Sequence, residues 1–249
     1  SQLPIVFLIE HIEAYQRKRL VEKKIPFIVP AKQLYIPNLF IDLNEVRRGK
    51  PALSREHLSP AAQCLLLYHL QVKNLDELPL KVIAKNIGYS GMTISRIAKE
   101  LEQFSICNIT GTKEKALDFF DDKKETWNKL LDVSQSPVKQ KYFANQMPAP
   151  GQLLQGGESA MEHYTHLAAN KTKTFAVGKE DFSTFKKMKA IKDLNQSEGD
   201  FLIEVWIYNP VLLSKSKYVD PLSLYLSMKD STDDRTQIEL EKLLNNVKW

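Results

Sequence analysis

Residues 80–117 read LKVIAKNIGYSGMTISRIAKELEQFSICNITGTKEKAL, and they carry the most regular pattern in the chain. Within them, four apolar residues recur at the spacing of one helical face: Ile94, Ile97, Ala98 and Leu101. We therefore predict an amphipathic helix over residues 92–103, with this stripe buried against a core. Ser90 stands where its hydroxyl can cap the first turn of that helix.

The residues on both sides extend this pattern into a recognisable order of elements. Ser59 followed by Pro60 is typical of a helix start, with an N-cap and a proline at the first helical position. The expected elements are a helix at 61–72, a helix at 80–87, a turn at 88–91, the helix at 92–103, and strands at 106–109 and 116–119. Three helices followed by a strand–loop–strand are the order of a winged helix-turn-helix.

A winged helix places its third helix in the major groove of DNA, so the outer face of that helix must be polar. Arg96 is placed to hydrogen-bond a guanine edge or a phosphate. The free amides at the start of the helix suit a phosphate, and the surrounding lysines suit the DNA backbone. The predicted DNA-binding residues are Lys81, Lys85, Ser90, Gly91, Met92, Thr93, Ser95, Arg96, Lys99, Lys113 and Lys115. The plainer alternative is a helical hairpin with a solvated polar face.

The same stretch resembles the winged helix of MarR-type transcriptional regulators, which share a similar pattern through the recognition helix. The matching positions are Ala84, Gly88, Ser90, Thr93, Ser95, Arg96 and Leu101. The resemblance covers about 60 residues and implies a DNA-binding regulator. It departs after the recognition helix, where the family usually has glycine and this chain has Phe104 and Ser105. The dimerisation helices of that family are not evident, so the resemblance leaves the dimer open.

The C-terminal part of the chain carries a second, looser resemblance. The segments that carry it are GGESAMEHYTHL (156–167), IEVWIYNP (203–210), VDPLSLYLSM (219–228) and DDR (233–235). They resemble the C-terminal region of bacterial winged-helix proteins close to the abortive-infection type IV antitoxins. That resemblance implies an autoregulating DNA binder whose larger domain serves a protein partner.

We predict a mixed α+β protein with four regions. They are an N-terminal strand–helix–strand region at 1–57, the winged helix at 58–120, a connector at 121–150 and a mixed α/β domain at 151–249. In the first region we expect a buried strand at 3–9, a helix at 11–24, an edge strand at 25–30 and a strand at 33–36. Further on we expect helices at 121–131, 158–168, 221–227 and 236–247, and strands at 175–177 and 201–208.

Two polar clusters offer alternative chemistry. His163 and His166 lie three apart on an expected helix and could face a metal, although a polar surface is the plainer interpretation. The carboxylates that could hold magnesium are Glu204, Asp220, Asp230, Asp233 and Asp234. Asp220 before Pro221 and the Asp233-Asp234 pair before a helix favour N-terminal capping instead.

Aromatic residues and known motifs add little support for catalysis. Trp206 and Tyr208 could stack on single-stranded bases, but such aromatics belong more often to a core. The sequence contains no P-loop, no G-x-G-x-x-G and no G-x-S-x-G motif. We therefore predict no enzymatic activity and no cofactor.

The composition fits a cytoplasmic globular protein. The net charge is +5, and basic and acidic blocks alternate along the chain, as in a protein that touches polyanions with some surfaces. The two cysteines, Cys64 and Cys107, form no C-x-x-C motif and are expected to be buried reduced thiols. The longest apolar run falls far short of the ~20 residues of a membrane span, so no membrane partner is expected.

These patterns together predict a bacterial, sequence-specific regulator of transcription, acting as a repressor, with double-stranded DNA as its partner. A homodimer and a protein partner for the C-terminal region stay open. The alternatives are an antitoxin whose C-terminal domain opposes a toxin, and a metal-dependent nuclease or nucleotidyltransferase that uses the C-terminal carboxylates.

Overall fold

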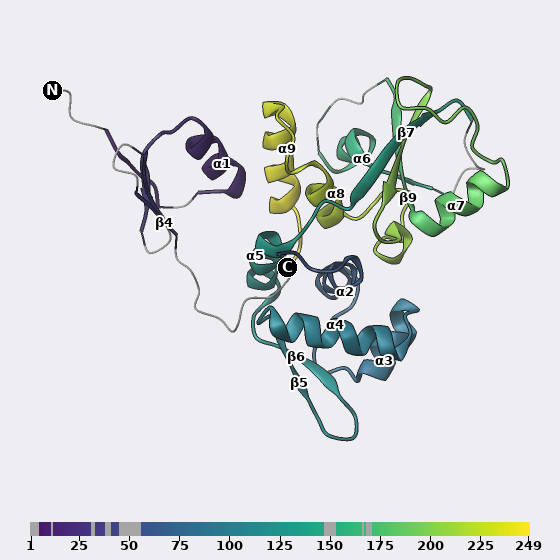
Figure 1. Cartoon of the computed structure of the whole chain (residues 1–249), viewed down its shortest axis with the longest axis horizontal. Helices are drawn as coiled ribbons and strands as arrows, with labels where there is room; N and C mark the ends of the chain where they lie inside the picture. The colour runs from purple at the N-terminus through teal and green to yellow at the C-terminus, as the bar shows by residue number, and fades with distance from the viewer. Residues whose placement is uncertain are drawn as a thin grey trace. The chain divides into compact units, whose positions relative to one another are not determined.

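The computed structural model describes residues 5–10, 12–30, 33–37, 41–44, 56–146, 153–165, 167 and 171–249. The chain divides into two compact units, residues 1–51 and 52–249. Both units combine helices with small sheets, which confirms the predicted mixed α+β class (Figure 1).

The described part of the first unit contains a four-stranded sheet, in the strand order β1-β2-β3-β4, and one helix. Strand β1 pairs with β2 in parallel, and the other neighbours are antiparallel. The elements are β1 (Phe7–Leu8), α1 (Ala14–Glu22), β2 (Phe27–Val29), β3 (Gln33–Ile36) and β4 (Ile41–Asn44).

Two expectations for this unit are wrong. Strand β2 was expected at an edge because prolines bracket it, yet it lies between β1 and β3. Pro26 and Pro30 flank the strand without entering it, so every amide of Phe27–Val29 is available to the sheet. The first strand was expected to be buried, but β1 is an outer strand whose Phe7 and Leu8 are exposed. Residues 3 and 4 of that expected strand lie outside the described residues.

The second unit begins with the predicted winged-helix order. Its elements are α2 (Pro60–Gln71), α3 (Leu80–Ile87), α4 (Gly91–Gln103), β5 (Cys107–Thr110) and β6 (Ala116–Phe119). Ser59 caps α2 as expected, since its hydroxyl accepts a hydrogen bond from the Ala62 amide. Glu100 of α4 also holds the N-terminus of α2 in place. Its carboxylate accepts hydrogen bonds from the Ser59 amide and hydroxyl at 2.6 and 2.7 Å.

The turn between α3 and α4 depends on glycine. Gly88 ends α3 in the left-handed conformation, with a φ of 77° that L side chains rarely adopt. Ser105, just after α4, has a φ of 58°. Ser105 lies in the segment after the recognition helix where the MarR-type pattern usually has a glycine, and the serine adopts a conformation that glycine reaches at lower cost.

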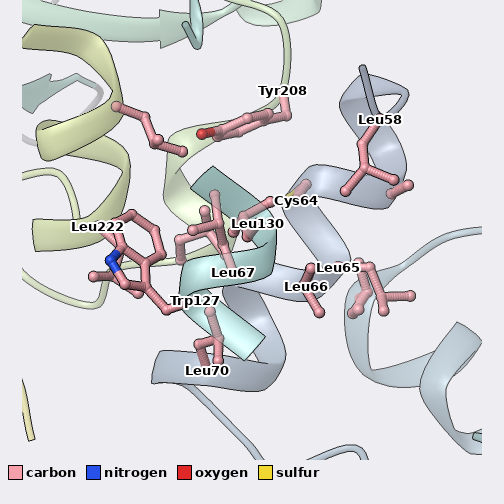
Figure 2. Close-up of a cluster of buried hydrophobic side chains, with 14 of the residues drawn as sticks. Leu58, Cys64, Leu65, Leu66, Leu67, Leu70, Trp127, Leu130, Tyr208 and Leu222 are labelled. Atoms are coloured by element: carbon pink, nitrogen blue, oxygen red, sulfur yellow. The ribbon is translucent and has the colours of Figure 1, made fainter. Parts of the chain in front are cut away.

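Helix α2 lies in the middle of this unit because it is apolar on nearly every side. Its buried residues are Ala62, Gln63, Cys64, Leu65, Leu66, Leu67, His69 and Leu70. A helix that is apolar all round must be covered on all sides. Helix α4 contacts α2, and so does helix α5 (Lys123–Val133). Figure 2 shows the α2 leucines together with Trp127 and Leu130 of α5.

The remaining elements form a four-stranded sheet and its helices. The strand order is β7-β10-β9-β8, with β10 parallel to β9 and antiparallel to β7. The elements are β7 (Val138–Ala144), β8 (Leu154–Gln155), α6 (Gly157–Tyr164), β9 (Lys173–Gly178), α7 (Lys179–Lys187), β10 (Phe201–Trp206), the 3-10 helix η2 (Pro210–Leu212), α8 (Pro221–Met228) and α9 (Asp234–Asn245). The elements that were not expected from the sequence are β4, β7, β8, α7 and η2.

One hydrophobic core joins the winged-helix elements to this C-terminal region. Leu67 of α2, Trp127 of α5 and Leu222 of α8 belong to the same buried cluster. Gln71 adds a polar link, because its side chain donates to Asp220 Oδ1 at 2.6 Å and accepts from the Leu222 amide at 3.3 Å. The helices that could read DNA are therefore packed into the same body as α8.

Candidate nucleic-acid interface

Helix α4 has two opposite faces, and its buried face is the predicted one. Ile94, Ile97, Ala98 and Leu101 are all at most 2% exposed, which confirms the predicted stripe. The opposite face carries the exposed residues Met92, Ser95, Arg96 and Lys99, again at the spacing of one helical face. We call these four residues the outer stripe of α4.

The start of α4 is capped and exposed. Ser90 Oγ accepts a hydrogen bond from the Thr93 amide at 3.1 Å, and the two hydroxyls lie 2.8 Å apart. Thr93 is therefore half-buried and tied to the cap, whereas Gly91 and Met92 are exposed. The first amides of a helix have no acceptor within it, so those of Gly91 and Met92 can bind an anion.

Arg96 is a solvent-exposed cation on the outer stripe of α4. Among the residues that the structure describes, no ion pair includes it. Its Nη2 contacts the Met92 sulfur at 3.6 Å, one helical turn earlier. The guanidinium is thus directed toward the N-terminal end of α4, with its fork of donors available to a ligand.

The predicted lysines of α3 and of the hairpin are exposed as well. Lys81 and Lys85 lie one turn apart on α3, and Lys113 and Lys115 lie in the loop between β5 and β6. The Lys115 carbonyl accepts a hydrogen bond from the Leu80 amide at 2.8 Å, so the base of this loop is joined to the start of α3. Figure 1 shows the hairpin projecting from the helices beside α4.

Some exposed polar residues on these elements were not singled out in the sequence. Asn86 on α3 and Thr112 in the hairpin loop are exposed, and amide and hydroxyl groups commonly bind phosphates. Their signal in the sequence is weak, because polar residues are ordinary in turns. Glu114 is also exposed in the loop and reduces its positive charge.

We expect Lys113→Ala to weaken binding to every duplex alike. Removing the phosphate contact that is predicted for Lys113 should reduce the slope of log affinity against log salt by about one. The affinity at physiological salt should fall by about 1.4- to fivefold, since an exposed ion pair is worth ~0.2–1 kcal/mol. Fluorescence anisotropy on a specific and a scrambled duplex measures both quantities. The control is Lys187→Ala, an exposed lysine of α7, and an equal loss in this control would contradict the assignment.

The aromatic and acidic alternatives have structural roles. Trp206 and Tyr208 are 0% and 5% exposed, which confirms that they belong to the core. Asp220 and Asp233 cap α8 and α9, because their carboxylates accept hydrogen bonds from the amides of Ser223 and Thr236. Glu204 is buried and accepts from the Trp206 indole and from Lys141.

The histidine pair is only partly described. His163 lies on α6, and its ring stacks on that of Tyr218 with the ring centroids 3.9 Å apart. His166 lies outside the described residues. Within the described ranges, no three His, Cys, Asp or Glu side chains are grouped so that they could hold a metal ion.

A cavity of about 520 Å³ beside α5 has polar walls that are already engaged. His69 accepts a hydrogen bond from the Leu75 amide and stacks on Phe119. Burial lowers the pKa of His69 to about 4, so the ring is neutral at pH 7. Asp76 accepts from the Phe119 amide, and Asp122 caps α5. These contacts shape the cavity wall and leave few free groups for a ligand.

Asp220 differs from Asp233 in its surroundings. Asp220 is buried, and its Oδ2 has no hydrogen-bond partner among the described residues. Burial raises its pKa above the ordinary value, because a charged carboxylate loses its hydration. Asp233 is exposed, and the hydrogen bonds from Thr236 lower its pKa.

We expect Asp220→Asn to make the protein more stable than the wild type at high pH. The pKa of Asp220 is higher in the folded state than in the unfolded state. Its contribution to stability is therefore fully present below the unfolded-state pKa and is lost as the pH rises through the folded-state pKa. Asparagine caps a helix equally well and cannot ionise, so the gain should be of order 1 kcal/mol. Urea unfolding at several pH values measures it.

Asp233→Asn is the control with the opposite sign. The pKa of Asp233 is lower in the folded state than in the unfolded state. Its contribution to stability is therefore fully present above the unfolded-state pKa and is lost as the pH falls through the folded-state pKa. This variant should therefore lose stability at neutral pH and match the wild type in acid. If Asp220→Asn behaved in the same way, Asp220 would be an ordinary charged cap.

Comparison of the chain with protein-family models, with curated proteins and with solved structures finds no match. Among the described residues, no helix is long and apolar enough to span a membrane.

Proposed function

We propose that this chain binds double-stranded DNA in a sequence-specific manner and regulates transcription as a repressor. The observation that carries the proposal is the outer stripe of α4, which is exposed opposite a buried stripe. A helix with these two faces, followed by a basic hairpin loop, is the arrangement that enters a major groove. The resemblance to MarR-type regulators supports the same function.

The residues divide into those that hold the backbone and those that read bases. Lys81, Lys85, Lys99, Lys113 and Lys115 would contact phosphates, which supply affinity but carry no sequence information. Arg96 and the first turn of α4 would supply the sequence preference. Such a protein represses a promoter by covering it, and it works in the bacterial cytoplasm, where the chromosome lies.

The test is fluorescence anisotropy with a duplex from the region upstream of the gene that encodes this chain. A scrambled duplex is measured beside it, each at two salt concentrations. We expect tighter binding to the natural duplex, with affinity that falls steeply with salt. Equal and weak binding to both would contradict the proposal. The stoichiometry of the complex also shows whether a homodimer reads two half-sites, which would lie about one helical turn of DNA apart.

A further inference from the structure

Met92 is a large apolar side chain at an unexpected place. It is 68% exposed, although it belongs to the outer stripe of α4, whose other members are polar or charged. Single exposed apolar residues are common on protein surfaces and need no explanation by themselves. Met92 stands out because it lies in the first turn of the helix that would enter the groove, in contact with the cation that would read a base.

The contact between Met92 and Arg96 places the guanidinium beside the thioether. The Arg96 Nη2 lies 3.6 Å from the Met92 sulfur. Stacked bases along a DNA strand are separated by ~3.4 Å. A guanidinium and a thioether in contact therefore match two neighbouring base pairs better than two distant ones.

The two side chains select different chemical groups in the major groove. An arginine fork matches the O6 and N7 acceptors of guanine. The thymine methyl is the group at a base edge that an apolar side chain prefers to contact. Ser95 and Lys99, the other members of the outer stripe, offer a hydroxyl and a point charge, and neither of these singles out thymine.

We propose that Met92 and Arg96 together read a thymine next to a guanine in the operator. Arg96 hydrogen-bonds the guanine edge, and Met92 covers the methyl group of the adjacent thymine. This inference rests on the proposed function, since it requires α4 to lie in the major groove. It adds the identity of two neighbouring bases and makes Met92 a specificity-determining residue.

The test starts from duplexes selected by the wild-type protein out of a random library. We expect every selected duplex to contain a thymine beside a guanine. Replacing that thymine with deoxyuridine removes only the methyl group and should weaken binding about fourfold. Replacing the guanine with 7-deazaguanine removes the N7 acceptor and should weaken binding about tenfold.

Three variants assign the methyl contact to Met92. Met92→Ala should bind the thymine and uracil duplexes equally, whereas Met92→Leu should keep most of the preference. Val82→Ala is the matched control, because Val82 is 40% exposed on α3 and should leave the fourfold preference unchanged. Equal binding of all the variants to the scrambled duplex shows that each is folded and retains its phosphate contacts.

Different failures have different meanings. If no sequence is selected, both the proposed function and this inference are overturned. If a sequence is selected without a thymine beside a guanine, only this inference is overturned. The same holds if Met92→Ala retains the full preference for thymine over uracil.

Discussion

Replacing Leu222 with alanine is expected to lower the free energy of unfolding by about 2–5 kcal/mol. Leu222 is 0% exposed in the first turn of α8 and belongs to the same core as Leu67 and Trp127 (Figure 2). The change leaves a cavity where α2, α5 and α8 share one core, while the capping bond of the Leu222 amide to Gln71 can persist. The loss of stability should therefore extend to the winged-helix elements.

The measurement combines urea unfolding with hydrogen exchange read by mass spectrometry. We expect peptides from α4 and from β10 to lose protection together, since one core joins them. Val211→Ala is the control, because Val211 is 54% exposed in η2 and its truncation should cost little. If α4 kept its full protection from hydrogen exchange while β10 lost protection, the two regions would unfold independently.

Replacing Arg96 with alanine is expected to reduce the preference for the specific duplex over a scrambled one by about 5- to 150-fold. The loss concerns the specific complex, because a bidentate contact to guanine exists only there. Affinity for the scrambled duplex should change much less. Stability should stay the same, since Arg96 is exposed and its only described side-chain contact is with Met92.

Arg96→Lys distinguishes base reading from simple attraction to DNA. Lysine keeps the positive charge but lacks the planar fork that matches guanine O6 and N7. We expect this variant to lose most of the sequence preference and to keep the salt dependence. Wild-type specificity in Arg96→Lys would assign Arg96 to a phosphate, and the reading of bases would belong to other residues of α4.

Short-range patterns were enough to predict the elements of the winged helix. The bounds of α3 and β6 agree with the expected ranges, and the buried face of α4 follows directly from the spacing of its apolar residues. The caps at Ser59, Asp220 and Asp233 were also predictable, because an N-cap interacts with amides two or three residues later. The residues that would meet DNA are exposed, apart from the half-buried Thr93, and their role in binding stays a prediction.

Sheet neighbours were not predictable in the same way. Strand β7 reads VKQKYFA and has little apolar character of its own, so its conformation depends on pairing with β10, some sixty residues later. The place of β2 inside its sheet depends likewise on pairing with β1, from which α1 separates it in the sequence. The Met92–Arg96 spacing is visible in the sequence, but the contact itself depends on the side-chain conformations.

The sequence alone was enough to predict most of the helices, the caps at Ser59, Asp220 and Asp233 and the face that α4 presents, because each of these depends on residues within about one helical turn. Helix α7 was not predicted. The tertiary structure showed that α2 is buried on nearly every side. Only the tertiary structure decided what covers it. Leu222 and Asp220 reach α2 from about 150 positions away, and contacts at that separation depend on packing that no local pattern encodes.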